Sequence, residues 1–345
     1  MYNGGRLVVD LKRSFIDSAG ARHYAKACIG AVEDIDPFRR EVAGESLKDK
    51  LNNNLKDPNV VSQKGLIEMF DSTIGRSTVL MPYGGELQLT ETQVSVQKLP
   101  TDGYTDTASI MAFGFNPVIS KWSPYHGAAY SMVEACAKVV AAGGHYEKMR
   151  FSCQEYFERM THDPKVWGKP MSALLGSLKM QIELGLPSIG GKDSMSGTFE
   201  HINVPPTLIS FGITTVDANK VISPELKWEG NQLYLIKHTP RADRMPDVDQ
   251  LKKNWAYVTE QIEAGNIVSA WAVGFGGVAE ALCKMSFGNA FGVDVKIPEN
   301  ELFDYSYGSI VVESEGSLDF ENAEYLGLVT SGVDDCLRIN AKNIP

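Results

Sequence analysis

This 345-residue chain lacks closely spaced pairs of cysteines. Its five cysteines are widely spaced and never form a C-x-x-C pair, which argues against a disulfide framework or a structural zinc site and predicts a reducing, cytoplasmic setting. No apolar run approaches the roughly 18 residues that a membrane-spanning helix needs. The first residues lack the basic and then apolar pattern of a secretory signal, and they are typical of a chain entered midway.

Positive charge is also scarce. The chain has 33 Lys and Arg residues and 43 Asp and Glu residues, which gives a net charge of −10. This balance gives no long-range attraction for nucleic acid or an anionic membrane, so both are excluded as default partners. The spacings of a Walker A loop, a Rossmann fingerprint, a nucleophile elbow and a zincin helix do not occur, and the six histidines show no metal-ligand spacing.

The length predicts about two domains at roughly 150 residues each. We expect a linker or N-terminal extension over 1–59, one α+β unit over 60–225 and a second over 226–345. Because strand patterns cluster before helix patterns in each unit, mixed or antiparallel sheets are favoured over a doubly wound sheet. The expected strands are 78–81, 86–89, 94–99, 105–115, 148–152, 207–216, 233–236, 267–273, 293–297, 309–312 and 325–329.

Three long helices are expected between these strands. Ser123 and Pro124 are a typical helix start, with a serine cap and a proline in the first turn. A second helix has apolar residues at helical spacing and ends at Gly185. A third covers about 247–264. The apolar positions of the second helix are Met171, Leu174, Leu175, Leu178 and Ile182.

The run Gly190, Gly191, Lys192, Asp193 and Ser194 is the first candidate site. Paired glycines let backbone N–H groups approach an anion, and a lysine and a hydroxyl add a charge and a hydrogen bond. From the residues alone, a surface turn is the favoured alternative.

Gly276 and Gly277 are the second candidate, because they open a helix whose free N–H groups attract phosphate. The favoured alternative is a glycine turn that lets a helix and a sheet pack closely.

Asp102 and Glu134 are the third candidate, since two carboxylates could meet at a magnesium ion. A glutamate within a helix is more often solvated or paired.

Several motifs occur together in one order. They are 59–66 (NVVSQKGL), 70–75 (FDSTIG), Asn116-Pro117, 123–129 (SPYHGAA), Glu134 and 186–196 (LPSIGGKDSMS), with a weaker match at Gly276-Gly277 and Ala279-Glu280. Over about Val60 to Thr330 the chain resembles the large phosphoribosylformylglycinamidine synthases of purine biosynthesis, specifically the second of their two synthetase-like halves.

This resemblance implies a fold like that of aminoimidazole ribonucleotide synthetase. Such a unit has an N-terminal domain whose strands join a sister unit into a shared barrel, and a C-terminal mixed α/β domain. The implied reaction is the ATP-dependent amidation of formylglycinamide ribonucleotide. ATP phosphorylates the formamide oxygen, and ammonia made from glutamine displaces it, with magnesium as a helper.

The resemblance also implies roles for individual residues. Residues 190–194 match the loop that faces ATP and the ribonucleotide, with Gly191, Lys192 and Ser194 carrying the match. Thr101, Asp102 and Glu134 match an auxiliary, non-catalytic magnesium–nucleotide site. Two further ligand positions depart from the family, because Lys138 and Ala272 replace oxygen ligands. Lys138 follows Glu134 by one helical turn, which predicts an ion pair in place of the metal.

The implied partners are a sister synthetase half, which carries the catalytic histidine, and a glutaminase domain. Neither has a counterpart in these 345 residues, so no catalytic residue is assigned here. A fragment that contributes one wall of the synthetase site is the favoured function, and we expect it to pair with a second copy. The alternatives are a non-catalytic scaffold half that completes the barrel without nucleotide, and a self-associating kinase-like synthetase.

Overall fold

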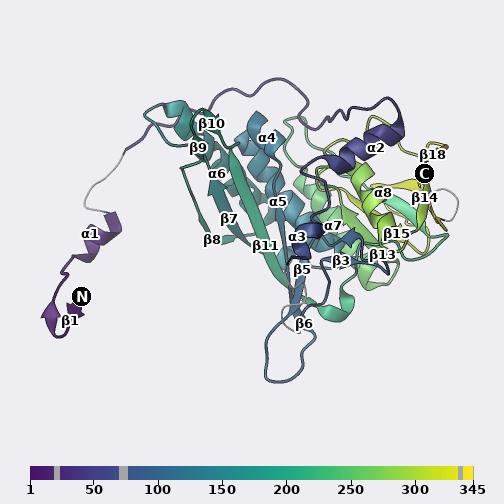
Figure 1. The fold of residues 1–345 in the computed structure, drawn as a ribbon, viewed down its shortest axis with the longest axis horizontal. Helices are drawn as coiled ribbons and strands as arrows, with labels where there is room; N and C mark the ends of the chain where they lie inside the picture. The colour runs from purple at the N-terminus through teal and green to yellow at the C-terminus, as the bar shows by residue number, and fades with distance from the viewer. Residues whose placement is uncertain (19–23, 70–76, 333–336, 345) are drawn as a thin grey trace.

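The computed structural model describes residues 1–18, 24–69, 77–332 and 337–344. Two larger sheets dominate it (Figure 1). The first is five-stranded, and all its pairs are antiparallel except β7 with β8. Its strand order is β5 (Ser95–Lys98), β6 (Thr107–Gly114), β11 (Thr207–Asp217), β7 (Arg150–Tyr156) and β8 (Ser188–Lys192).

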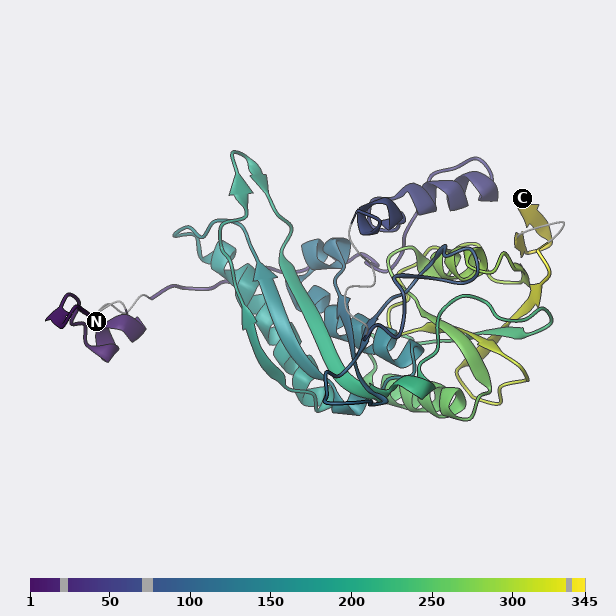
Figure 2. The ribbon, with the colours of Figure 1, turned by 60° about the horizontal axis from the view of Figure 1, so that its bottom comes forward.

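Side chains of this sheet alternate between a covered and an open face, as strand geometry requires. On β6, Ile110 and Ala112 are buried, whereas Met111 and Phe113 are exposed. Helices α5 (Pro124–Ala141) and α6 (Pro164–Leu184) cover the buried face (Figure 2). Within the described residues this sheet remains open, with β5 and β8 at its edges, and it forms no closed barrel.

The two helices expected after 123 and before Gly185 are confirmed. Ser123 caps α5 by accepting the N–H of His126, and α5 is buried along nearly its whole length. The apolar residues that predicted α6 nevertheless point outward. Its inner face is made mainly of small residues instead, because α6 packs closely on α5. These inward residues are Gly168, Pro170, Ser172, Ala173, Gly176, Ser177, Met180 and Leu184.

The second sheet has seven strands of mixed direction, with α7 (Val248–Glu263) and α8 (Gly277–Phe287) packed against it. The mixed sheets expected from the sequence are therefore confirmed. The order is β13 (Ile267–Ala272), β15 (Ile310–Ser314), β12 (Gln232–Ile236), β16 (Ala323–Thr330), β14 (Gly292–Val295), β17 (Leu337–Ile339) and β18 (Lys342–Ile344).

Helix α5 joins the two sheets. One continuous apolar core contains Ile110 of β6, Val133 of α5, Trp255 of α7 and Ile310 of β15. A second core lies between α8 and the other face of the seven-stranded sheet. The two sheets thus share buried side chains, and the division of the chain at 225 and 226 stays a prediction.

Two short strands expected before 90 are wrong. Residues 78–81 make only a single bridge, from Thr78 to Gln97. Residues 86–89 form a turn, in which the N–H of Leu87 donates to the Gly288 carbonyl. The strands of this stretch are instead the two-residue pair β3 (Tyr83–Gly84) and β4 (Thr90–Glu91).

The first 59 residues include an arm and a docked helix. The arm carries β1 (Tyr2–Asn3), β2 (Arg6–Leu7) and α1 (Arg13–Ser18), and it stands away from the body in Figures 1 and 2. Helix α2 (Leu47–Lys56) packs on α8. The remaining elements are α3 (Lys64–Ile67), α4 (Pro117–Trp122), the short 3₁₀ helices η1 (Tyr146–Lys148) and η2 (Ala218–Lys220), β9 (Thr198–Phe199) and β10 (Ile202–Asn203). Over the described ranges, no helix has the length and hydropathy to cross a membrane.

Candidate functional site

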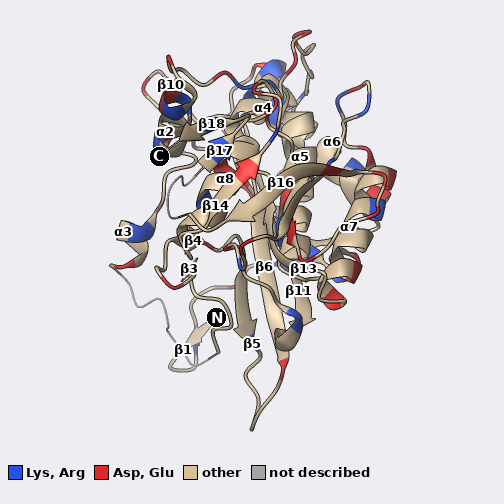
Figure 3. Ribbon diagram, turned by 90° about the vertical axis from the view of Figure 1, so that its right-hand side faces the viewer, with Lys and Arg blue, Asp and Glu red and all other residues tan. Residues whose placement is uncertain are grey.

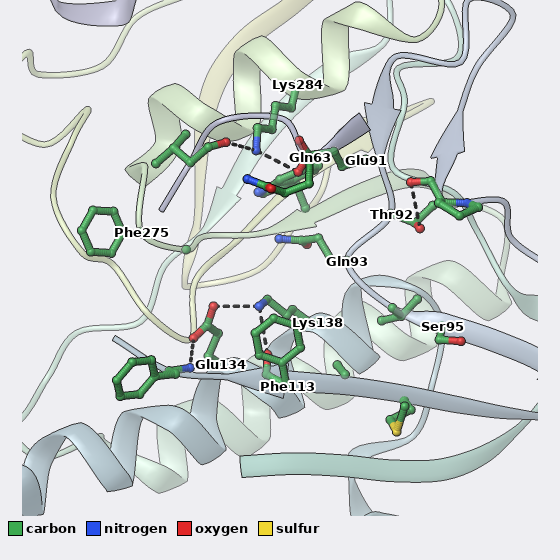
Figure 4. Close-up of a pocket in the computed structure, with 18 of the residues that line it drawn as sticks. Gln63, Glu91, Thr92, Gln93, Ser95, Phe113, Glu134, Lys138, Phe275 and Lys284 are labelled. Carbon is green, nitrogen blue, oxygen red and sulfur yellow. Dashed lines mark hydrogen bonds and ion pairs between the residues drawn. The ribbon is translucent and has the colours of Figure 1, made fainter. Parts of the chain in front are cut away.

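A cavity of about 710 Å³ lies between the outer face of the five-stranded sheet and the elements β13 and α8 (Figure 4). Aromatic side chains form much of its wall, among them Phe113, Phe275 and Trp271. Two groups of charged side chains enter it, one from α5 and one from α8 and β4. Glu134 and Lys138 are in the first group, and Glu91, Glu280 and Lys284 are in the second.

The ion pair predicted between Glu134 and Lys138 is confirmed. The Lys138 Nζ lies 2.8 Å from Glu134 Oε1 and also donates to the Phe113 carbonyl at 2.9 Å. Glu134 Oε2 accepts the N–H of Phe115 at 2.8 Å. Both carboxylate oxygens are therefore engaged by donors of this chain, and the lysine occupies the side of the carboxylate that a cation would need.

Lys284 is the centre of the second group. Only 5% of its side chain is exposed, and its Nζ donates to Glu280 Oε1 at 2.8 Å, to Glu91 Oε2 at 2.9 Å and to the Val60 carbonyl at 2.6 Å. Burial by itself lowers the pKa of Lys284, but the two carboxylates outweigh burial and raise that pKa above its ordinary value. Burial raises the pKa of Glu91, whose Oε1 has no hydrogen-bond partner in the part of the chain that the structure describes.

The start of α8 is already occupied. Glu280 Oε2 accepts the N–H of Gly276 at 2.9 Å, and the N–H of Ala279 donates to the Leu302 carbonyl at 2.9 Å. Gly277 has a φ of +69°, and a Cβ there would lie 2.6 Å from the Leu302 oxygen. Close packing thus explains these glycines, and a phosphate at Gly276 and Gly277 would have to displace a carboxylate of the chain itself.

Ala272 lies beside this cavity and provides no ligand atom from its side chain. Its backbone N–H and carbonyl bind the amide of Gln93, at 2.8 and 2.9 Å. Gly274 lies between the two charged groups, because a Cβ there would be 3.7 Å from Glu134 and 3.8 Å from Glu280. The cavity thus holds three carboxyl groups and two ammonium groups that already pair with one another.

The structure does not bring Asp102 and Glu134 together. Thr101 and Asp102 lie exposed in the loop between β5 and β6, which projects from the sheet in Figure 1. Glu134 instead contacts Phe115, just past the other end of β6. Because β6 runs from 107 to 114, seven residue steps separate the two ends, or about 24 Å. In the described chain, no group of three or more His, Cys, Asp or Glu side chains could hold a metal ion.

The run 190–194 is not a free loop. Gly190, Gly191 and Lys192 belong to the edge strand β8, and all three are exposed. A Cβ on Gly191 would lie 2.5 Å from the Cys153 oxygen, so this glycine permits the close pairing of β8 with β7. Just past the strand, the N–H of Ser194 donates to the Glu155 carbonyl, and its hydroxyl lies 3.2 Å from that of Ser196.

Glu155 was not anticipated from the sequence. It lies on β7 beside this run and is only 6% exposed, and its Oε1 has no hydrogen-bond partner among the described residues. Burial raises its pKa to about 7, with a further contribution from the charge of Asp193. A glutamate between a glutamine and a tyrosine carries no local signal of burial, so only the tertiary structure could reveal it.

Subunits of one biosynthetic enzyme are similar to this chain over most of its length. No protein-family model matches the chain. The phosphoribosylformylglycinamidine synthase subunit PurL of Pyrobaculum aerophilum is 26% identical over 259 residues, which are 70% of this chain and 35% of that protein. The same subunit of Lactobacillus delbrueckii subsp. bulgaricus is 24% identical over 316 residues, or 84% of this chain and 40% of that protein. The chain therefore spans about a third to two fifths of the curated relatives it matches.

Two solved structures share the fold of this chain. Thermotoga maritima PurL complexed with AMPPCP matches 94% of this chain and 48% of its own, with a TM-score of 0.65 and 15% identity. AaThiL complexed with AMPPCP and TMP matches 82% of this chain and 94% of its own, with a TM-score of 0.56 and 12% identity.

The architecture is therefore that of the aminoimidazole ribonucleotide synthetase-like proteins, a class of mixed α/β folds. Within that class, the chain is related over most of its length to the PurL subunit of phosphoribosylformylglycinamidine synthase. The resemblance indicated by the sequence motifs is thereby confirmed. The motif at 70–75 lies outside the described residues.

Proposed function

We propose that this chain forms one wall of the synthetase site of an ATP-dependent ligase of purine biosynthesis. The ligase would convert formylglycinamide ribonucleotide, ATP and glutamine-derived ammonia into formylglycinamidine ribonucleotide. The supporting observation is the match of 94% of this chain to less than half of a PurL protein complexed with an ATP analogue. A cytoplasmic location stays a prediction.

The run from Gly190 to Ser194 would be this chain's contribution. Lys192 is exposed and has no ion-pair partner among the described residues, so its ammonium is available to an anionic substrate. Gly190 has open space where a Cβ would be, which allows a ligand to approach the backbone. ATP, when bound in the complete site together with magnesium, would supply the phosphoryl group that makes the formamide oxygen a leaving group.

The partners would be the sister half of the synthetase and the glutaminase. A PurL protein from Thermotoga maritima is solved in an assembly named PurLQS. The outer face of the five-stranded sheet here exposes Met111, Phe113 and Ile213, and only the short stretch around Thr78 covers the edge of β5. Such surfaces need a cover. We propose that the sister half covers them, and that a second copy does so when that half is missing.

A non-catalytic role is favoured for the cavity next to α8. Magnesium prefers oxygen ligands in near-octahedral geometry, but the Lys138 ammonium contacts the Glu134 carboxylate. The second carboxylate expected there, Asp102, lies at the far end of β6. The residues present therefore do not fit a magnesium–nucleotide complex, and in this part the chain would act as a scaffold.

Calorimetric titration of the purified chain with ADP and magnesium tests this view. We expect binding no tighter than about 10 μM, or roughly −7 kcal/mol, because the ion pairs of the cavity leave no site for the metal. Lys138→Asn is the test variant, because it removes the ammonium that competes with magnesium for the Glu134 carboxylate. Lys121→Asn, at an exposed position on α4, is the control. Tighter, magnesium-dependent binding by the unaltered chain would contradict the scaffold role.

The synthetase proposal is tested by a product assay with ATP, magnesium, formylglycinamide ribonucleotide and free ammonia. The chain alone is expected to give no product, because half of the site is missing. With the sister half added as a separate chain, we expect turnover that falls at least tenfold in Lys192→Ala and stays unchanged in Lys179→Ala on α6. Turnover by the isolated chain would show that it holds a complete site. Equal turnover in the Lys192→Ala and Lys179→Ala variants would show that Lys192 is not part of the synthetase site.

A further inference from the structure

The outer face of α6 carries a continuous apolar stripe. Five large side chains along three turns are between 37% and 71% exposed. Because they recur at helical spacing, they lie on one side of the helix. An exposed patch of this kind on a monomeric protein marks an interaction surface. The stripe consists of Met171, Leu174, Leu175, Leu178 and Ile182.

The N-terminal arm also exposes apolar side chains. Residues 1–18 leave a comparable set of apolar side chains in water: Leu7, Val8, Val9, Leu11, Phe15 and Ile16. The arm's own structure is too small to bury them. Its hairpin has two residues in each strand, and its helix has six residues. Elements of this size are marginal in water without tertiary packing.

The same chain is already attached to α6 just after the arm. The N–H of Cys28 donates to the Pro164 carbonyl at 2.8 Å, and Gly168 faces the Cys28 carbonyl so closely that a Cβ would overlap it. The extension then continues over α4, where the Trp122 indole N–H donates to the Glu33 carbonyl at 2.9 Å. An interface between the extension and this side of the molecule therefore exists, and it ends at the first turn of α6.

The distances permit the arm to reach the stripe. From Gly168 to Ile182 the helix rises 14 residues, or about 21 Å. The ten residue steps between Ser18 and Cys28 can span about 33 Å when extended. The tether also keeps the arm at a high effective concentration near the helix, which favours this occupant over a free partner.

We propose that residues 1–18 dock on the apolar stripe of α6 and extend the interface that begins at Cys28. The docked arm covers Leu174, Leu178 and Ile182 with the side chains that it cannot bury by itself. This inference does not depend on the proposed ligase activity.

Limited trypsin digestion of the full chain tests the docking, with cleavage after Arg6 and Lys12 followed by mass spectrometry. Leu174→Ser, Leu178→Ser and Ile182→Ser are combined in one variant, which should fold because these side chains are exposed. We expect trypsin to cleave this variant after Arg6 and Lys12 at least tenfold faster than the unaltered chain. The matched control, Tyr325→Ser with Leu328→Ser on β16, also removes exposed apolar residues and should cleave at the original rate.

Three results would overturn the proposal. Equal cleavage rates in all three proteins would mean that the arm does not contact the stripe. Equal acceleration in the control would mean that the substitutions act through general loosening. Light scattering that shows an oligomer dissociated by the α6 variant, with arm cleavage unchanged, would assign the stripe to a second copy of the chain.

Discussion

Replacing Lys284 with methionine is expected to lower the free energy of unfolding by about 3–5 kcal/mol at neutral pH. Methionine keeps most of the length of the side chain but removes the buried ammonium. Glu280 and Glu91 then face each other without the charge that both contact. Denaturant unfolding at pH 7 measures the change. A loss below 1 kcal/mol would mean that the carboxylates find other donors.

Two comparisons show whether charge is the cause. Lys237 also bridges two glutamates, Glu301 and Glu324, but it is 31% exposed, so Lys237→Met should cost at most about 1 kcal/mol. Adding Glu280→Gln to Lys284→Met should restore part of the loss, because one of the two unpaired carboxylates disappears. The cost of Lys284→Met should also shrink near pH 4, where Glu91, whose pKa burial raises, becomes neutral.

Glu155→Gln is expected to stabilise the protein at pH 8 by about 1–3 kcal/mol and to change little at pH 5. Burial raises the pKa of Glu155 from 4.5 to about 7, and the charge of Asp193 contributes. The folded state therefore holds a proton that the unfolded state releases between these values. Stability from this group is present below pH 4.5 and is lost as the pH rises through 7. Glutamine has the same shape without that titration.

Glu158→Gln is the matched control for this prediction. Glu158 lies three residues further along and is similarly buried, but Lys169 and the Asn203 amide pair with its carboxylate. Its neutralisation should therefore destabilise the protein at pH 8, the opposite sign. Unfolding free energies of both variants at pH 5 and 8 give the answer. A Glu155→Gln effect that is equal at the two pH values would mean that the carboxyl is ionised throughout.

Local patterns predicted local structure well in this chain. Ser123 and Pro124 located the start of α5, and the spacing of Glu134 and Lys138 predicted their ion pair, because residues four apart on a helix are neighbours whatever surrounds them. The helical period also located α6. It could not show which face of α6 is buried, since that depends on how closely α5 approaches.

Contacts between distant segments were decided only by the tertiary structure. Asp102 and Glu134 do not lie on the same helix or strand, and the length of β6 keeps them apart. Lys284 meets Glu91 and Val60 across about 200 residues of sequence, and Glu155 acquires its raised pKa from burial on β7, with a contribution from the charge of Asp193. The sequence by itself determined the family resemblance, the mixed α/β class and the main helices, because these depend on motifs and on short-range periodicity. Burial and long-range charge pairing required the folded chain, because both depend on which surfaces the fold brings together.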